Sequence, residues 1–398
     1  MGPLSGIRVL AVEQYGAGPF GTQALADLGC EVVKIENPHD GGDVSRSLGP
    51  YHDEALGETA TSLFFQAFNR NKRAMTLNLK TPEGCALAKE LILQADVVIN
   101  NFRPGTMEKF GIGYDEIKAL NPRVIYGELH AFGKTGPMAH IGANDLQLQA
   151  HSGLAAITGQ AGGPPNRAGS AIVDLHTGLA LVSAILGALF HRERTGAGQL
   201  VSTSLLQGAA HLMGYFYQEY WATGYVHQAM GTATHLSTPN QAFPTKNGWT
   251  VIIAPSQPMY ERCVAALEAP HLMMPPFDTR EGRMRNREQL IRVMSEVTRS
   301  YTNEEIYERL GAAKVNVAIV QDVGQAADHP QLEEVGGIHH TDVNGEPRKF
   351  VASPFSYSDT PTRMHLPAPR LGEHTEEILR NMGRSTDQIA ALKSAGAV

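Results

Sequence analysis

Residues 7–36 read IRVLAVEQYGAGPFGTQALADLGCEVVKIE, and this stretch decides the fold. The short apolar run at 7–12 predicts a strand, and the glycine-rich turn after it leads into a helix over 21–28. A second apolar run at 31–35 predicts the next strand. A strand, a helix and another strand in this order predict two parallel strands joined by a crossover helix.

The same alternation continues along the first 130 residues. A helix is expected after Thr81, because threonine is a favoured N-cap residue and Pro82 would occupy the first helical position, where proline is common. The apolar residues of this helix, and the apolar runs that follow it in the sequence, continue the alternation of strands and helices. The further expected elements are strands at 96–99 and 124–126 and helices at 114–120, 174–194 (ending at the glycines of 195–198) and 204–221. This predicts an α/β fold, with a doubly wound, Rossmann-like large domain.

Residues 224–322 show a different sequence pattern, in which several prolines separate short segments. A strand is expected at 249–253 and helices at 259–267 and 303–310, which together predict a smaller α+β domain. The expected boundaries are 1–200 with 335–398 for the large domain, 201–224 for a linker helix, 225–325 for the small domain and 326–334 for a second linker.

Composition excludes several classes of protein. The chain has 33 basic and 40 acidic side chains, a net charge of −7, which disfavours a nucleic-acid-binding protein. The longest apolar run, 179–190, is shorter than the ~20 residues that cross a bilayer, so no membrane association is expected. The three widely spaced cysteines give no metal or disulfide pattern, which favours the cytoplasm. The sequence at 339–342, HHTD, is interpreted as exposed loop residues, and no metal site is expected.

Glycine is in excess, with 41 of 398 residues. Gly16, Gly18 and Gly21 form a GxGxxG turn after the first strand, and Glu36 lies 20 residues beyond Gly16. This is the fingerprint of dinucleotide binding, although Pro19 removes one N–H donor from the turn. Three interpretations stay open: an NAD-binding module, a site for another phosphorylated ligand, or a purely structural turn. Basic residues after the strands, among them Lys34, Arg46, the 70–73 cluster and Lys80, favour a ligand with several phosphates.

Asp174 lies at the start of the long apolar helix, among small residues. One interpretation is an N-cap. The other is a nucleophile: the helix dipole keeps the carboxylate ionised, and an ionised carboxylate can attack a thioester carbon.

Short motifs occur along the chain: LSGIRVL at 4–10, GP at 18–19, LG at 28–29, VKIE at 33–36, NKR at 71–73, KTPEG at 80–84, NFRPG at 101–105, GKTGP at 133–137, RTGAGQ at 194–199 and PRLGEHT at 369–375. In these motifs and their order the chain resembles the class III CoA-transferases (formyl-CoA transferase, carnitine CoA-transferase and α-methylacyl-CoA racemase superfamily) over nearly its whole length.

The resemblance implies an interlocked homodimer and a CoA-transferase whose nucleophile is Asp174, with Asn144 and Asp145 near the substrate. It implies no permanently bound cofactor; coenzyme A and acyl-CoA are substrates, together with small carboxylic acids. The CoA-binding positions that it implies are Tyr15, Gly16, Ala17, Asn37, Leu77, Lys80, Asn101, Phe102, Arg103 and Lys109.

Two departures from the family narrow the expected reaction. Formyl-CoA transferases have glutamine at position 16, arginine at position 37 and a glycine run where this chain has 230–235, MGTATH. The related racemases need a histidine where Asn144 stands, and an amide cannot cycle a proton near neutral pH. The expected activity is transfer of CoA from a donor such as succinyl-CoA to a small acid, through an anhydride and an aspartyl-CoA thioester at Asp174. A racemase-like enzyme and an NAD-binding module remain the alternatives.

Overall fold

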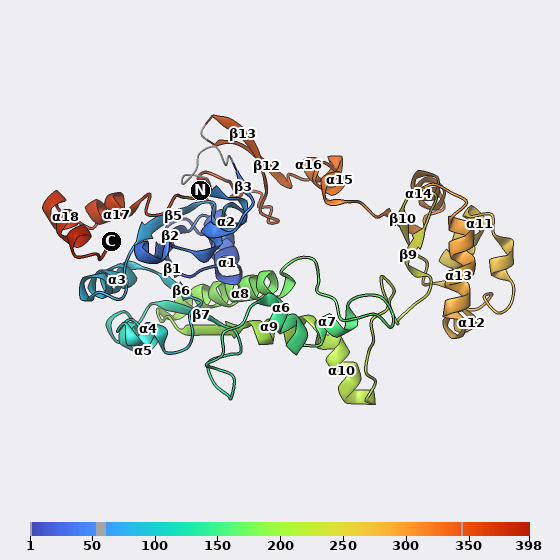
Figure 1. The fold of residues 1–398 in the computed structure, drawn as a ribbon, viewed down its shortest axis with the longest axis horizontal. Coiled ribbons are helices and arrows are strands. Elements are labelled where there is room, and N and C mark those ends of the chain that lie inside the picture. Colours follow the sequence, from blue (N-terminus) through green and yellow to red (C-terminus); the bar gives the residue numbers. More distant parts are fainter. Residues whose placement is uncertain (1, 53–60, 344) are drawn as a thin grey trace. The chain divides into compact units, whose positions relative to one another are not determined.

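The computed structural model describes residues 2–52, 61–343 and 345–398, which divide into two compact units (Figure 1). The first unit comprises 1–154, 168–224 and 334–398, and the second comprises 155–167 and 225–333. Residues 201–224 belong to the first unit, where they form the end of a strand and two helices. This differs from the expected linker helix, because the helix expected over 204–221 is interrupted at Met213.

A six-stranded parallel sheet organises the first unit, in the order β5-β2-β1-β6-β7-β8. Among these six strands the order is 3-2-1-4-5-6, which is that of the Rossmann-like doubly wound fold. The strands are β1 (Arg8–Val12), β2 (Glu31–Glu36), β5 (Lys72–Thr76), β6 (Val97–Asn100), β7 (Ile125–His130) and β8 (Leu200–Ser204).

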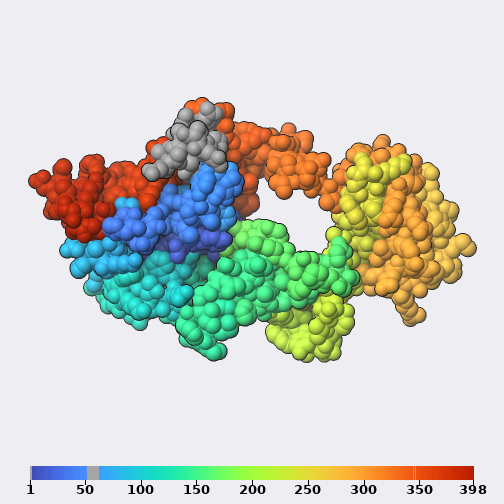
Figure 2. All heavy atoms as spheres, in the orientation of Figure 1, coloured from blue at the N-terminus to red at the C-terminus, as the bar shows by residue number. Residues whose placement is uncertain are grey.

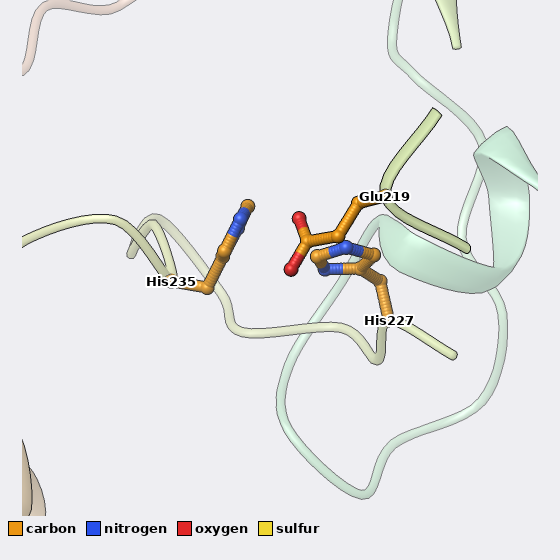
Figure 3. Close-up of side chains that lie close together, drawn as sticks. All are labelled: Glu219, His227 and His235. Atoms are coloured by element: carbon orange, nitrogen blue, oxygen red, sulfur yellow. The ribbon is translucent and has the colours of Figure 1, made fainter. Parts of the chain in front are cut away.

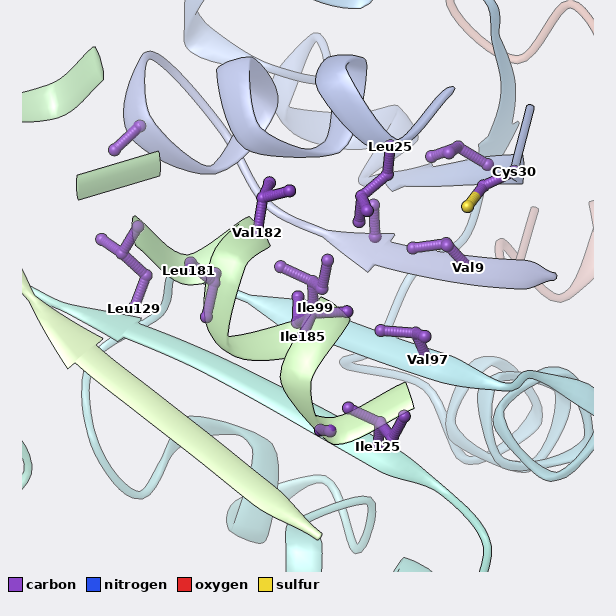
Figure 4. Close-up of a cluster of buried hydrophobic side chains, with 14 of the residues drawn as sticks. Val9, Leu25, Cys30, Val97, Ile99, Ile125, Leu129, Leu181, Val182 and Ile185 are labelled. Carbon is purple, nitrogen blue, oxygen red and sulfur yellow. The ribbon is translucent and has the colours of Figure 1, made fainter. Parts of the chain in front are cut away.

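Helices cover both faces of this sheet. In β1, Val9 points into a core with α1 (Ala17–Asp27) and α8 (Ile172–Thr195), while Leu10 points into the core on the opposite face. Figure 4 shows the first of these cores, where Leu25 of α1 and Ile185 of α8 meet the strands. The other helices of this unit are α2 (Leu63–Asn69), α3 (Pro82–Gln94), α4 (Thr106–Lys109), α5 (Tyr114–Leu120), α6 (Asp145–His151), α9 (Leu205–Leu212), α10 (Gly214–Thr223), α17 (Thr375–Asn381) and α18 (Thr386–Ser394), while all but the last residue of α16 (Pro330–Glu334) belongs to the second unit.

Local signals explain where the main helices begin and end. Thr81 caps α3 by accepting a hydrogen bond from the Gly84 N–H at 3.0 Å, as expected. Gly196 ends α8 in the left-handed conformation, with a φ of 77°. Among the described residues, α8 alone is long and apolar enough to cross a membrane by length and composition, but half of that stretch is buried within the chain. Its packing against α1 and the sheet accounts for its apolar character.

The chain returns to the first unit after residue 334 and adds a hairpin and two helices. The hairpin joins β12 (Ile338–Val343) and β13 (Glu346–Val351), so residues 339–342 lie in a strand rather than in the expected loop. The C-terminal segment lies beside the N-terminal strands (Figures 1 and 2): His374 accepts from the Ala74 N–H, and Thr375 accepts from the Thr76 N–H at 2.9 Å.

The second unit is a smaller α+β structure with its own core. It contains an antiparallel three-stranded sheet, β11-β10-β9, on which Phe243 and Ile252 are fully buried. Its elements are β9 (Asn240–Pro244), β10 (Trp249–Ile253), α11 (Gln257–Ala266), α12 (Arg280–Arg285), α13 (Arg287–Thr298), α14 (Asn303–Ala312), β11 (Asn316–Ile319) and α15 (Val323–Ala327), while α7 (Leu154–Ile157) lies at the boundary between the units.

Candidate active site

The candidate site lies where the strand order of the large sheet reverses. The turn after β1 (residues 13–16) and the turn after β6 (residues 101–105) follow neighbouring parallel strands, so they meet at the carboxyl edge of the sheet. In doubly wound folds this crevice is where ligands bind. Two adjoining cavities open here, and all the residues that line them belong to the first unit.

Asp174 lies in the wall of one cavity and is only 3% exposed. It is the third residue of α8, whose N-cap is Ala171, so the N-cap interpretation of Asp174 is wrong. Asp145, the first residue of α6, takes over part of the capping: its Oδ2 accepts from the N–H groups of Val173 at 2.8 Å and Asp174 at 3.2 Å. Asp145, the acidic residue expected near Asp174, therefore accepts hydrogen bonds from the backbone of Asp174 and of its neighbour.

Burial, together with the Asp145 carboxylate, raises the pKa of Asp174 from 3.8 to about 7. The sequence led us to expect an ionised carboxylate held by the helix dipole. The structure corrects this expectation, because loss of hydration disfavours the charged form more than the dipole favours it. At neutral pH the carboxylate is thus near its midpoint, and its high basicity makes the ionised form a better nucleophile.

The three glycines of the GxGxxG turn are each required by contacts within the protein. A methyl group on Gly16 would lie 2.5 Å from Asp174 Oδ2, and one on Gly21 would lie 2.8 Å from the carbonyl oxygen of Gly178. A methyl group on Gly18 would lie 2.9 Å from Glu13 Oε2. The glycines therefore bring α1 against α8 and leave room for the Asp174 carboxylate.

Glu36, the acidic residue of the dinucleotide fingerprint, already has hydrogen-bond partners within the protein. Glu36 accepts two hydrogen bonds from Arg46, each at 2.7 Å, and a third from the N–H of Asp43 at 2.9 Å. Its side chain is 1% exposed, so it cannot bind a ribose hydroxyl without losing these partners. This contradicts the NAD interpretation of the turn.

Several of the basic side chains expected to bind phosphates are internal ion-pair partners. Lys34 and Lys72 are completely buried, and Arg70 forms a two-pronged pair with Asp27. Burial lowers the pKa of Lys72 to about 8. These cations stabilise carboxylates beneath the site rather than a ligand, which corrects the expectation from sequence.

The expected CoA-binding positions are brought together around the two cavities, with one exception. The first cavity, of about 480 Å³, is lined by Asn37, Leu77 and Lys80. The second, of about 340 Å³, is lined by Tyr15, Gly16, Ala17, Asn144 and Asp174. Lys109, at the end of α4, lines neither cavity. The residues shared by both are Gln14, Asn101, Phe102, Arg103 and Gly142.

Two of these positions have their side chains already engaged. Asn101 accepts from the Gln14 N–H at 3.1 Å and donates to the Gln14 carbonyl at 2.7 Å. Asn37 caps the short 3-10 helix η1 (Pro38–Asp40) by accepting from the His39 N–H at 3.1 Å. These side chains shape the cavity wall, and direct contact with a ligand falls to their backbone groups or to their neighbours.

His130 is a cavity residue that sequence reasoning missed. It is 4% exposed at the end of β7, and its two ring nitrogens face the Phe102 carbonyl at 3.2 Å and the Glu128 carboxylate at 3.3 Å. Lys134 also donates to Glu128, at 3.0 Å. The position of His130 at the carboxyl end of a strand, next to the NFRPG turn in space, was the signal that could have identified it.

Two histidines of the second unit, His227 and His235, lie close together. Figure 3 labels both, and it also labels Glu219, a residue of α10. The two histidine rings pack edge to face, with 4.4 Å between centroids. We derive no metal chemistry from them.

A Rossmann-like sheet with two adjoining cavities at its switch point places the chain among the doubly wound α/β proteins that bind ligands at this edge of the sheet. A family model described as CoA-transferase family III matches residues 4–375, and the chain belongs to this family. It is therefore a CoA-transferase.

Characterised relatives cover nearly the whole chain. A succinate–glutarate CoA-transferase of Agrobacterium fabrum is 33% identical over 96% of both chains. A succinyl-CoA:mesaconate CoA-transferase of Haloarcula marismortui is 35% identical over 97% of this chain and 98% of its own. The crystal structure of a CaiB/BaiF family protein from Brucella suis superposes with a TM-score of 0.86, at 31% identity over 96% of this chain and 99% of that one.

Proposed function

We propose that this enzyme moves CoA from a dicarboxylic acyl-CoA such as succinyl-CoA to a second small carboxylic acid, with Asp174 as the nucleophile. The observation that carries the proposal is the buried Asp174 carboxylate in the wall of a cavity that adjoins the one lined by Asn37, Leu77 and Lys80. The nucleotide and pantetheine would occupy the first cavity. The thioester would reach Asp174 past the residues that the two cavities share.

The chemistry runs through two anhydrides and one thioester. An Asp174 oxygen attacks the donor acyl carbon, and the C–S bond breaks to release CoA thiolate. The thiolate attacks Asp174 Cγ, which releases the donor acid and leaves an aspartyl-CoA thioester. The acceptor carboxylate attacks Cγ, the thiolate leaves again, and its attack on the acceptor acyl carbon regenerates the Asp174 carboxylate. No net proton is consumed, and each step replaces one good acyl leaving group by another.

Dicarboxylic acids fit the second cavity because of its size and charge. Its volume of about 340 Å³ admits only a small acyl group, and Arg103 lines it. No ion pair of Arg103 is found among the described residues, so its guanidinium is available to a carboxylate. The relatives named above act on succinyl, glutaryl and mesaconyl groups, which supports the same class of substrate.

An oxygen-18 experiment tests this mechanism. The enzyme is incubated with succinyl-CoA and an acceptor acid labelled in its carboxylate, and the peptide that contains Asp174 is analysed by mass spectrometry. The proposal predicts that one label enters Asp174, because the acceptor oxygen that attacks Cγ stays there. Label-free Asp174 after complete turnover would contradict the proposal, and direct exchange between the two acids would give that result. Asp174→Asn, which should form no covalent intermediate, is the control.

We also propose the homodimer that the resemblance implies. The support is apolar surface on two helices of the first unit: Phe190 of α8 is 65% exposed, and on α10 Tyr215 and Trp221 are 60% and 72% exposed. No residue of α10 is buried. Apolar surface of this extent is typical of interaction sites. Sedimentation equilibrium should give twice the chain mass, and a monomer at micromolar concentration would contradict the dimer.

A cytoplasmic location remains a prediction. The three cysteines are free, and burial raises the pKa of both Cys30 and Cys263 to about 12, so these thiols are unreactive core residues.

A further inference from the structure

Two buried ion pairs adjoin the turn after β1: Lys72 with Glu13, and Lys34 with Asp43. Lys34 Nζ and Asp43 Oδ2 lie 2.8 Å apart, and both side chains are 0% exposed. Lys34 also donates to the Glu13 carbonyl at 2.9 Å, and Asp43 Oδ1 accepts from the Tyr15 N–H at 3.0 Å. The Lys34–Asp43 pair therefore fixes the turn at two points, on either side of Gln14.

This turn needs such support. Tyr15 has a φ of 74°, in the left-handed region that residues with a side chain disfavour. The next residue, Gly16, packs so tightly on Asp174 Oδ2 that no side chain fits between them. A shift of the Tyr15 peptide group therefore moves the surface against which the Asp174 carboxylate is held.

The side chain of Asp43 is held in place by hydrogen bonds from Ser45, two residues further along the same loop. Its Oδ1 also accepts from the Ser45 N–H at 2.9 Å and from the Ser45 hydroxyl at 2.7 Å. Burial alone would raise the pKa of Asp43, but Lys34 and the hydrogen bonds hold it below its ordinary value. The group that receives the Tyr15 N–H is thus a charged acceptor with little freedom to move.

We propose that Lys34 and Asp43 are positioning residues for CoA transfer, which act by fixing the Tyr15–Gly16 backbone against Asp174. The inference rests on the proposed role of Asp174. Lys34 places Asp43, Asp43 holds the Tyr15 N–H, and the turn holds the carboxylate in the geometry for attack. Neither residue needs to touch the reacting atoms.

Substitutions at Asp43 separate positioning from folding. Asp43→Asn keeps an oxygen acceptor for Tyr15, whereas Asp43→Leu removes it, and both leave Lys34 without its counter-charge. We expect Asp43→Leu to lower kcat about 100-fold, the effect of a misplacement of about 1 Å, while Asp43→Asn retains most of kcat. Asp43→Leu also loses the two hydrogen bonds from Ser45 and should be the less stable of the two variants, so kcat is compared only on folded protein. Equal kcat values in folded Asp43→Leu and Asp43→Asn would overturn the proposal.

A double variant keeps the test decisive if Asp43→Leu does not fold. Lys34→Met combined with Asp43→Leu removes both charges, so no unpaired charge stays buried. We expect its melting temperature to recover toward that of the wild type while kcat stays low. Wild-type kcat in this double variant would refute the positioning role.

The pair between Asp27 and Arg70 is a matched control. It is a buried ion pair of the same unit, with an O–N distance of 2.6 Å, and it makes no contact with residues 13–16. Asp27→Asn and Asp27→Leu should lower the melting temperature and leave the kcat of the folded enzyme unchanged. Because oxygen-18 transfer to Asp174 is measured first in the wild type, absence of label there refutes the proposed function, whereas normal labelling rates in Asp43→Leu refute only the positioning role.

Discussion

Replacement of Asp174 by asparagine should stabilise the folded chain increasingly as the pH rises. The folded pKa of Asp174 is about 7 and the ordinary value is 3.8. The folded state thus binds this proton more tightly than the unfolded chain does. Its contribution to stability is complete below the unfolded pKa and is lost as the pH rises through the folded one. Asparagine has the same shape and stays neutral.

The magnitude follows from the separation of the two pKa values. Each pKa unit corresponds to about 1.4 kcal/mol, so ionisation of Asp174 costs the wild type about 4 kcal/mol by pH 8. Of this, about 2 to 3 kcal/mol is lost between pH 5 and pH 8. The free energy of unfolding of Asp174→Asn, relative to that of the wild type, should rise by the same amount over this interval. Any constant offset between the two proteins cancels in this comparison.

Urea unfolding followed by circular dichroism measures this difference at several pH values, with the protein concentration held constant because subunit association would also shift the transition. Asp359→Asn, which removes one negative charge at an exposed position, is the control. If the difference between Asp174→Asn and the wild type is flat from pH 5 to pH 8, burial does not raise the pKa of Asp174, and the electrostatic description of the site is wrong.

Four further outcomes follow from the same geometry. For the wild type, kcat/KM for the acyl-CoA donor should rise with pH up to about 7 and then level, because only ionised Asp174 attacks; a profile flat from pH 5 to pH 8 would contradict this. Gly16→Ala should lower kcat about 100-fold in the folded enzyme, since the new methyl group must displace the Asp174 carboxylate, and steady-state kinetics measures it. Gly178→Ala should cost about 1 to 3 kcal/mol in urea unfolding, because its methyl group would lie 2.4 Å from the Ala17 carbonyl; a neutral effect would mean that the helices separate easily. Thr81→Ala should cost about 1 kcal/mol by loss of its cap and leave kcat unchanged.

The pattern of apolar runs predicted elements of both units well. The expected helix at 114–120 and the strand at 249–253 have the observed bounds, and the termination of α8 at Gly196 is confirmed. These elements are encoded by local signals: capping residues, glycine at a helix end and apolar periodicity. The strand β5 was missed, because three of its five residues are Lys72, Arg73 and Thr76, and burial of a lysine in an ion pair has no local signature.

The candidate site was predicted less completely. Sequence similarity placed Asp174 and Asp145 together, but only the tertiary structure shows that Asp145 binds the backbone of Asp174. His130 and Asp43 were not predicted as parts of the site, and Lys34 was expected to bind a ligand rather than Asp43, because these roles depend on partners from distant segments. The expected state of Asp174 was wrong for the same reason, since burial cannot be read from the helix start alone.

The sequence by itself determined the order of strands and helices, the caps, and the family to which the chain belongs, because these depend on neighbouring residues and on short motifs. The tertiary structure decided which groups the glycines of the GxGxxG turn contact. Gly16 and Gly21 could equally have faced a pyrophosphate; packing of α1 against α8 turned them toward Asp174 and Gly178 instead. It also decided which charges are available to a ligand, since the free energy of a charge depends on its burial and its partner, and both are set by residues far apart in the chain.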